Sequence, residues 1–166
     1  LYIVLMLLPF QVTMVPSYLI LRQFGLLDTP WAIILPGIFS TFPVFIMERD
    51  FDTVPREVLE SASIDGANQW QRFWRIGIPL GIPGLISALT LGFLDAWNAI
   101  EQPMAFLESP QYWPLSLFFT DPANLDTKQL GLALAASLWM LLPSILAFRF
   151  GQTYLEAGLT KGAVKG

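Results

Sequence analysis

Few side chains in this sequence could do chemistry. The 166 residues include no His and no Cys, which removes the commonest general base and metal ligand and any thiolate site. The glycine-rich loop that cradles nucleotide phosphates, Gly-x4-Gly-Lys-Ser/Thr, is also absent from the sequence. We therefore predict no catalytic residue, no metal site and no cofactor, and we do not expect the chain to be an enzyme.

The remaining polar candidates lie in long apolar runs. Gln11, Thr13 and Asn98 could line a pathway through a membrane, or could equally satisfy backbone groups that prolines leave unpaired. Asp95 is the one ionisable candidate, near the end of its run. Proton- or ion-coupled carriers usually need charged groups in mid-membrane. Their absence argues against a secondary carrier, which stays an alternative together with a simple pore.

The composition indicates a membrane protein. Hydrophobic residues make up 54% of the chain and charged residues 13%, against about 25% charged in a typical soluble domain. The mean hydropathy is +0.56. A disordered or nucleic-acid-binding protein is therefore excluded, and a membrane protein is favoured over a soluble helical one.

The charged residues are distributed unevenly. Residues 48–75 carry ten of them, whereas four long runs carry none. At about 1.5 Å per residue, each run can cross a hydrocarbon core of roughly 30 Å. We predict an all-α, polytopic transmembrane bundle with spans at about 1–22, 30–48, 76–97 and 129–149.

Lys and Arg predict the orientation. Seven of these nine residues lie on the side that holds residues 48–75 and 149–166, and the other two are Arg22 and Lys128. Positive charge near span ends favours the cytoplasmic side. We therefore expect the loop 48–75 and the tail 150–166 to be cytoplasmic.

Small residues predict where helices approach closely. Gly84, Ala88 and Gly92 recur every four residues in the third span, and Gly131 and Ala135 do so in the fourth. This spacing lets helix backbones come together in a bilayer. We expect both sets to form packing faces, within this subunit or against a partner.

The polar loop 52–75 reads as two short helices, at 54–64 and 67–75. Asp52 or Thr53 is expected to cap the first helix, and Asp65-Gly66 to end it. Because the loop mixes acidic and basic side chains, a groove in a partner protein is favoured over the membrane surface.

The sequence of this loop resembles a known signature. Glu60-Ser61-Ala62-Ser63-Ile64-Asp65-Gly66-Ala67, followed by Phe73, Ile76, Ile78 and Pro79, is similar to the EAA loop of ABC-importer permeases. The nearest class is the carbohydrate-uptake, maltose-type permeases, which the tail 158–166 also resembles. Ser61 replaces an Ala of the pattern, and Ile78 replaces a Leu.

The resemblance implies a transport function. Such permeases usually have six spans, so the chain, which begins inside an apolar run, is expected to be a C-terminal part holding the last four. The residues implied to couple to an ATPase are Glu60, Ser61, Ala62, Asp65, Gly66 and Ala67. The implied partners are a second permease subunit, a cytoplasmic ABC ATPase dimer, an extracytoplasmic sugar-binding protein, the sugar itself and the bilayer of a bacterial cell membrane. A membrane anchor that docks another cytoplasmic protein is a further alternative.

Overall fold

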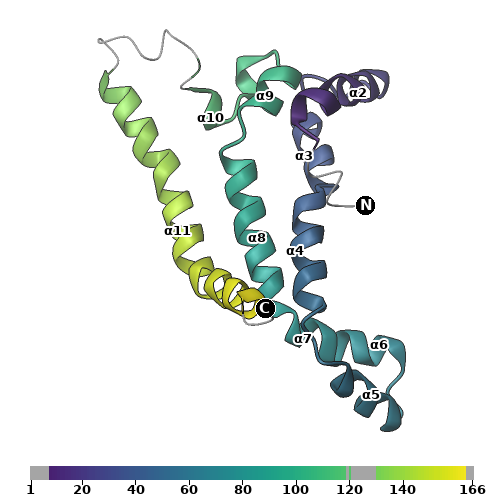
Figure 1. The fold of residues 1–166 in the computed structure, drawn as a ribbon. Helices are drawn as coiled ribbons and strands as arrows, with labels where there is room; N and C mark the ends of the chain where they lie inside the picture. Colours follow the sequence, from purple (N-terminus) through teal and green to yellow (C-terminus); the bar gives the residue numbers. More distant parts are fainter. Residues whose placement is uncertain (1–7, 119, 121–129, 164–166) are drawn as a thin grey trace. The chain divides into compact units, whose positions relative to one another are not determined.

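The computed structural model describes residues 8–118, 120 and 130–163, and every regular element among them is helical. Figure 1 labels most of these helices. In chain order they are α2 (Phe10–Gln23), α3 (Trp31–Ile38), α4 (Thr41–Phe51), α5 (Arg56–Ile64), α6 (Gln69–Arg72), the π-helix η1 (Phe73–Gly77), α7 (Ile78–Leu80), α8 (Ile82–Trp97), α9 (Glu101–Phe106), the 3-10 turn η2 (Pro110–Tyr112), α10 (Leu115–Phe118) and α11 (Leu130–Ala163). Contacts divide the chain into a first unit (1–41 and 93–147) and a second unit (42–92 and 148–166).

Within the described part of the chain, two continuous stretches are long and apolar enough to cross a membrane. They are Trp31–Phe51, which joins α3 and α4 over 21 residues, and Leu130–Glu156, the first 27 residues of α11. Both coincide with predicted spans, at 30–48 and 129–149. α11 also runs past the predicted end of its span to Ala163, so the start of the expected tail continues the same helix.

The other two predicted spans differ from the structure. The third, 76–97, corresponds to a broken helix pair, Gln69–Leu80 and Ile82–Trp97, bent by 64°. Residues 76–80 therefore continue the helix of the polar loop, and α8 begins at Ile82. The first, 1–22, overlaps α2, which has 14 residues and is not among the candidate spans; residues 1–7 lie outside the described part. The count of four spans stays a prediction.

Prolines account for two of the helix breaks. A proline cannot donate to the carbonyl four residues earlier, and its ring crowds that carbonyl. Pro43 thus removes the bond to Phe39, where α3 gives way to α4. Pro79 likewise removes the bond to the carbonyl of Arg75, which lies inside the π-helix η1. At the end of η1 the Ile78 N–H donates to the Phe73 carbonyl, five residues earlier, as in a π-turn.

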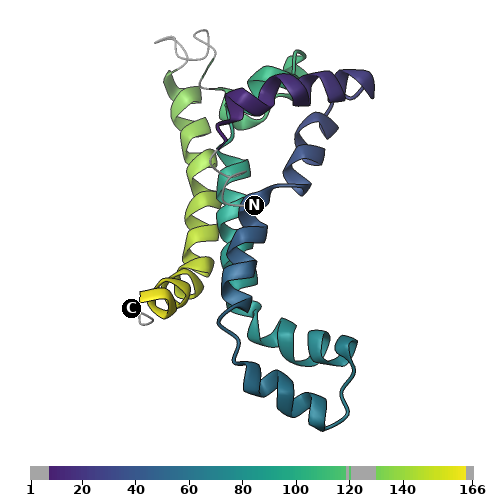
Figure 2. The same ribbon diagram turned by 45° about the vertical axis from the view of Figure 1, so that its right-hand side comes forward.

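The first unit has its own core around α9. Phe106, Leu107, Leu21 and Ala32 are buried together, from α2, α3 and the α9 region. The ring of Phe106 meets Phe10 edge-on at 6.0 Å between centroids. Figure 2 shows α2 and α9 side by side in this unit.

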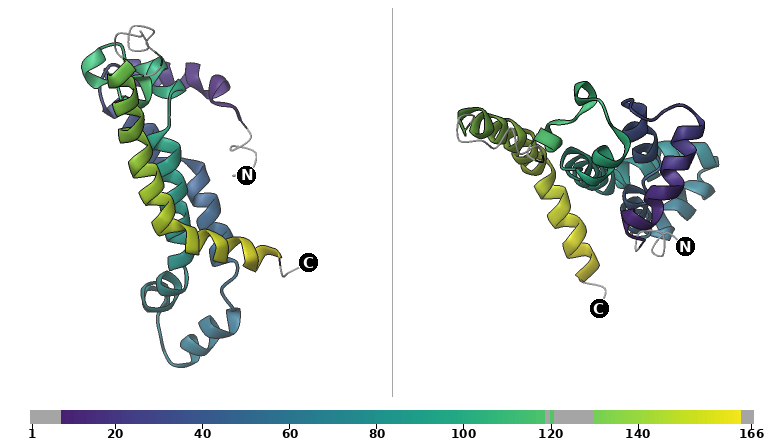
Figure 3. Two further views of the ribbon diagram at one scale, coloured as in Figure 1. Left: turned by 90° about the vertical axis from the view of Figure 1, so that its left-hand side faces the viewer. Right: turned by 90° about the horizontal axis from the view of Figure 1, so that it is seen from above.

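The second unit packs α4 and α11 on α8 through glycines. A side chain at Gly84 would come within 2.6 Å of the Asp50 carboxylate, and one at Gly151 would meet Thr90. α4 therefore lies directly against the first half of α8, as the left view of Figure 3 shows. The third-span packing face is confirmed, because Gly84 and Ala88 are buried and Gly92 has Pro43 3.5 Å from its built Cβ.

The fourth-span packing face is not buried among the described residues of this chain, and its contact with a partner stays a prediction. Gly131 and Ala135 are exposed, and nothing lies within 4 Å of a side chain built at Gly131. The buried small residues of this stretch are Ala133 and Ala136. The four-residue spacing was right for a close approach, but the choice of helix face depends on neighbours that the spacing does not name.

Candidate functional site

The polar loop folds as two helical segments joined by a tight turn. α5 begins at Arg56 after Pro55, whose extended backbone precedes the first turn. Neither Asp52 nor Thr53 caps it, contrary to the sequence prediction; the Thr53 hydroxyl donates instead to the Asp50 carbonyl at 2.7 Å. Pro55 supplies the turn geometry without a capping side chain, since its missing N–H is one that a helix start leaves unpaired.

The end of α5 depends on Gly66. Its φ is +84°, in the left-handed region. The Gly66 N–H donates to the Ser63 carbonyl at 3.1 Å, and the Ala67 N–H donates to the Ala62 carbonyl at 3.0 Å. These two bonds form a Schellman motif, which requires a residue that tolerates positive φ. The predicted break at Asp65-Gly66 is confirmed.

The second segment is longer than the predicted helix at 67–75, since it runs from Gln69 to Leu80. Asn68 starts it with a capping box: its side chain accepts from the Gln71 N–H, and the Gln71 side chain accepts from the Asn68 N–H, each at 2.9 Å. This box satisfies two N–H groups that the helix start would leave unpaired. The Asn-x-x-Gln spacing was a usable signal that the sequence analysis missed.

A hydrogen bond links the two segments directly. Arg72 Nη1 donates to the hydroxyl of Ser63 at 2.6 Å, while that hydroxyl donates to the Leu59 carbonyl at 2.8 Å. The Ser61 hydroxyl donates in the same way to the carbonyl of Glu57, four residues earlier, but it accepts no bond from any described Arg side chain. Nothing in the sequence marks Ser63 as the partner of Arg72, because the pairing depends on how the turn folds back.

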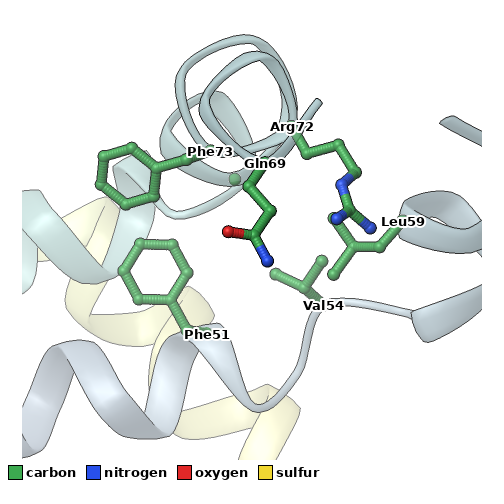
Figure 4. A pocket seen from close by; sticks show the side chains of 7 residues that line it. Phe51, Val54, Leu59, Gln69, Arg72 and Phe73 are labelled. Atoms are coloured by element: carbon green, nitrogen blue, oxygen red, sulfur yellow. The ribbon is translucent and has the colours of Figure 1, made fainter. Parts of the chain in front are cut away.

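Beside this link lies a pocket of about 360 Å³. Figure 4 shows Phe51 and Phe73 on one side of Gln69, and Val54 and Leu59 near Arg72 on the other. The full lining is Phe51, Val54, Leu59, Gln69, Arg72, Phe73 and Gly77. The inner faces of both segments and the end of α4 therefore surround one mostly apolar space.

The predicted coupling residues divide between two environments. Glu60, Ser61, Asp65 and Gly66 are exposed, Ala62 is buried, and Ala67 is half-buried. Glu57, Glu60, Ser61 and Ile64 follow the i, i+3, i+4, i+7 spacing of one helix face, and all four are exposed. Ile64 is 87% exposed. This outer face of α5, named here the acidic–apolar face, joins two carboxylates to a bare hydrophobic side chain.

The predicted pathway residues do not come together. Thr13 and Asn98 donate to carbonyls of their own helices, those of Phe10 and Leu94. Neither carbonyl is the one that Pro16 leaves free, which is that of Val12. Gln11 Nε2 instead donates to the Glu101 carboxylate at 2.8 Å and ties α2 to α9. Their role in a pathway stays a prediction.

A polar clasp in the first unit was not predicted. The Asp28 carboxylate accepts from the backbone N–H groups of Glu108 and Ser109 at 2.9 and 2.7 Å, and from the Ser109 hydroxyl. Asp28 itself has φ of +55°. These hydrogen bonds, led by that of the Ser109 hydroxyl, hold the pKa of Asp28 below its usual value. The clasp joins segments about 80 residues apart, which sequence spacing cannot reveal.

The described residues offer no cluster of three or more His, Asp or Glu side chains for a metal ion. What the geometry offers is an exposed acidic–apolar helix face, held rigidly on a loop. Comparison with known sequences indicates which kind of protein carries this helix face. A family model described as the binding-protein-dependent transport system inner membrane component matches residues 1–161. The chain belongs to this family.

Individual relatives of the chain include permease proteins of transport systems. The chain is 32% identical to protein LplC of Bacillus subtilis (strain 168), over 92% of the chain and 57% of LplC. It is 30% identical to the arabinooligosaccharides transport system permease protein AraQ of Halalkalibacterium halodurans, over 100% of the chain and 60% of AraQ. It is 29% identical to the lactose transport system permease protein LacG of Rhizobium radiobacter, over 96% of the chain and 58% of LacG.

The chain spans little more than half the length of these relatives. Its family and its apolar helices together place it in a membrane. The resemblance drawn from the loop motif is thus confirmed at the level of the family. Orientation, partners and substrate rest on further argument.

Proposed function

We propose that this chain forms part of the permease subunit of an ATP-driven ABC importer of carbohydrates. In this proposal the loop 52–75 faces the cytoplasm and docks in a cleft of the ATPase subunits. A second permease subunit completes the pathway, and an extracytoplasmic binding protein delivers the sugar. In this proposal ATP is hydrolysed by the ATPase subunits and not by this chain. The setting is a bacterial cell membrane with several spans.

The acidic–apolar face of α5 is the observation that carries the proposal. An exposed Ile beside carboxylates is costly in water but suits a protein groove that offers an apolar floor and basic walls. Ile64 and Glu60 lie one turn apart on this face, within the loop that resembles the EAA signature. The family membership supports the same role.

The rigidity of the loop supports a coupling mechanism. The Schellman turn, the capping box and the bond from Arg72 to Ser63 fix α5 relative to the segment Gln69–Leu80. That segment joins α8 at Gly81. A displacement of α5 by closing ATPases would therefore be passed to α8 rather than absorbed by a flexible linker.

The carbohydrate assignment rests on the relatives and on the loop and tail sequences. AraQ and LacG are described as permeases for arabinooligosaccharides and lactose. Those descriptions belong to the relatives. For this chain we propose the class, a sugar or oligosaccharide, and no individual compound.

Co-purification of the intact parent protein with its ATPase tests the docking site. Replacing Glu60→Arg and Ile64→Glu together should lower ATPase recovery by about tenfold or more, since both lie at the centre of the proposed contact. Glu108→Arg, an exposed charge reversal in the first unit, is the matched control and should bind normally. Equal recovery from the double variant would exclude α5 as the main dock. If the wild type itself binds no ATPase, the pore or secondary carrier becomes the better description.

A further inference from the structure

The two segments of the polar loop differ in charge. α5 and the turn after it carry Glu57, Glu60 and Asp65, whereas residues 66–94 contain no acidic side chain. The segment Gln69–Leu80 carries two Arg residues and three aromatic ones. A segment with aromatic and basic side chains and no acid has the composition of a helix that lies in a membrane interface.

Two large side chains of this segment are mostly exposed, although Trp74 also meets Phe73 edge-on at 5.3 Å between ring centroids. Trp70 is 72% exposed and Trp74 is 62% exposed. They are four residues apart and so share a helix face, and neither of them lines the pocket, which takes Gln69, Arg72, Phe73 and Gly77 from this segment. Arg75, next to Trp74, is exposed as well. The two Trp rings therefore lie outside the space between this segment and α5.

Continuity with a membrane helix indicates what covers this face. The segment runs into α8 after a bend of 64°. Figures 1 and 2 show α5 on the far side of α6 from α8. α5 is therefore the outermost part of the loop, and Gln69–Leu80 lies between it and the start of the span.

Helix rise and the bend give a depth for both Trp residues when Ile82, the start of α8, is taken as the edge of the hydrocarbon core. Trp74 and Trp70 precede Ile82 by about 12 and 18 Å along the segment, at 1.5 Å per residue. With a 64° inclination, only about 5 and 8 Å of this is measured along the α8 axis. The headgroup region on each side of a bilayer is about 5–8 Å thick. With Ile82 at the hydrocarbon edge and α8 along the membrane normal, the backbone at Trp74 and Trp70 comes to this depth.

We propose that the segment Gln69–Leu80 is an interfacial helix, with Trp70 and Trp74 seated among the lipid headgroups on the side of α8 that holds the polar loop. Indole rings favour this layer because one edge is apolar and the N–H is polar. Arg75 adds attraction to anionic headgroups. The segment thereby fixes the height of α5 relative to the bilayer surface. This inference concerns lipid contact and does not require an ATPase.

Site-directed fluorescence tests the proposal. The 166 residues contain no Cys, so a Cys introduced among them can carry an environment-sensitive probe once any Cys elsewhere in the parent protein is replaced by Ser. Trp74→Cys and Arg75→Cys report on the segment; the second keeps both Trp residues in case the first fails to fold. Ile64→Cys on α5 is the matched exposed control. The intact parent protein is placed in vesicles of phosphatidylethanolamine and phosphatidylglycerol without ATPase.

Lipid-borne nitroxide should quench the probes at 74 and 75 at least about twofold more than the probe at 64, because interfacial side chains lie among the headgroups. Aqueous iodide should show the reverse order. Equal iodide quenching at all three positions would overturn the proposal. So would a probe at 74 that becomes shielded only when ATPase is added, which would assign the face to the protein partner. The Glu60→Arg, Ile64→Glu variant separates the two proposals. It should lose ATPase binding and still show the same quenching by lipid-borne nitroxide at position 75.

Discussion

At the scale of single residues, backbone conformation is the clearest constraint. Gly66 and Asp28 both have positive φ: Gly66 lies in the turn that ends α5, and the Asp28 N–H donates to the carbonyl of Phe106. For Gly66 the residue type explains the conformation. For Asp28 the surrounding bonds do, since an L side chain adopts positive φ only at a cost.

Gly66→Ala should destabilise the turn by about 1 kcal/mol, because the new Cβ meets the backbone at φ of +84°. Nothing else lies within 4 Å of a Cβ at this position, so the effect is one of backbone strain alone. Limited proteolysis of the loop should become about fivefold faster. Gly37→Ala, at a helical glycine with equal space, is the control. An unchanged cleavage rate would argue against the left-handed turn.

The clasp at Asp28 predicts a dependence on pH. Its carboxyl pKa is lowered below the ordinary 3.8, so the ionised clasp contributes stability above that pH and loses it as the pH falls through the lower folded value. Near neutral pH, Asp28→Asn should speed amide exchange at Glu108 and Ser109, whose N–H groups it binds. Asp52→Asn, at an exposed carboxylate, should leave that exchange unchanged. Equal exchange in both variants would contradict the clasp.

At the scale of helices, the loop owes its shape to contacts at the ends of short elements. α5 has 9 residues and α6 has 4, too few to be stable alone in water. The capping box, the Schellman turn and the bond from Arg72 to Ser63 hold them together. Their function depends on acting as one body.

Ser63→Ala should loosen α5 from α6, because it removes the acceptor of the Arg72 guanidinium. Ser61→Ala is a close control, since its hydroxyl bonds only the carbonyl one turn earlier. The bond is partly solvated, and we expect about 1 kcal/mol for its loss. Spin-label distances between the two helices should broaden for the first variant only. Matching distributions in both would show that the bond does not hold the helices.

At the scale of the whole molecule, the chain needs lipid and close helix contacts. α11 leaves many large apolar side chains exposed, among them Leu138 and Trp139 at 62% and 70%. In a bilayer, exposing apolar side chains to lipid carries no hydrophobic cost. Helix association there depends on close van der Waals packing rather than on burial of apolar surface. Gly151 against Thr90 is such a contact in the second unit.

Gly151→Ala should lower the thermal stability of the purified protein, because its Cβ would overlap three atoms of the branched Thr90 side chain. Rotation of Thr90 cannot clear all three, so we expect about 1–3 kcal/mol of overpacking. Gly131→Ala in the same helix meets nothing within 4 Å and is the control. A variant at 151 as stable as the one at 131 would contradict the packing of α11 on α8.

The sequence by itself determined the class of this protein and the position of its polar loop. The charge-free runs and the dense charged block can be read directly from the sequence. Apolar runs enter lipid and charged ones stay in water whatever their tertiary contacts. The Gly66 turn was equally readable, since only local backbone geometry is involved.

Tertiary structure alone decided which residues meet. Asp28 finds Ser109, Arg72 finds Ser63, and Gln11 finds Glu101 across gaps that no spacing rule covers. The buried face of α11, the bend before α8 and the uncapped start of α5 were also not predicted. Which face of α11 is buried depends on the helices packed beside it, and those neighbours exist only in the folded chain. The other two features lie beside Pro79 and Pro55, whose local effect on the backbone was present in the sequence and was not recognised.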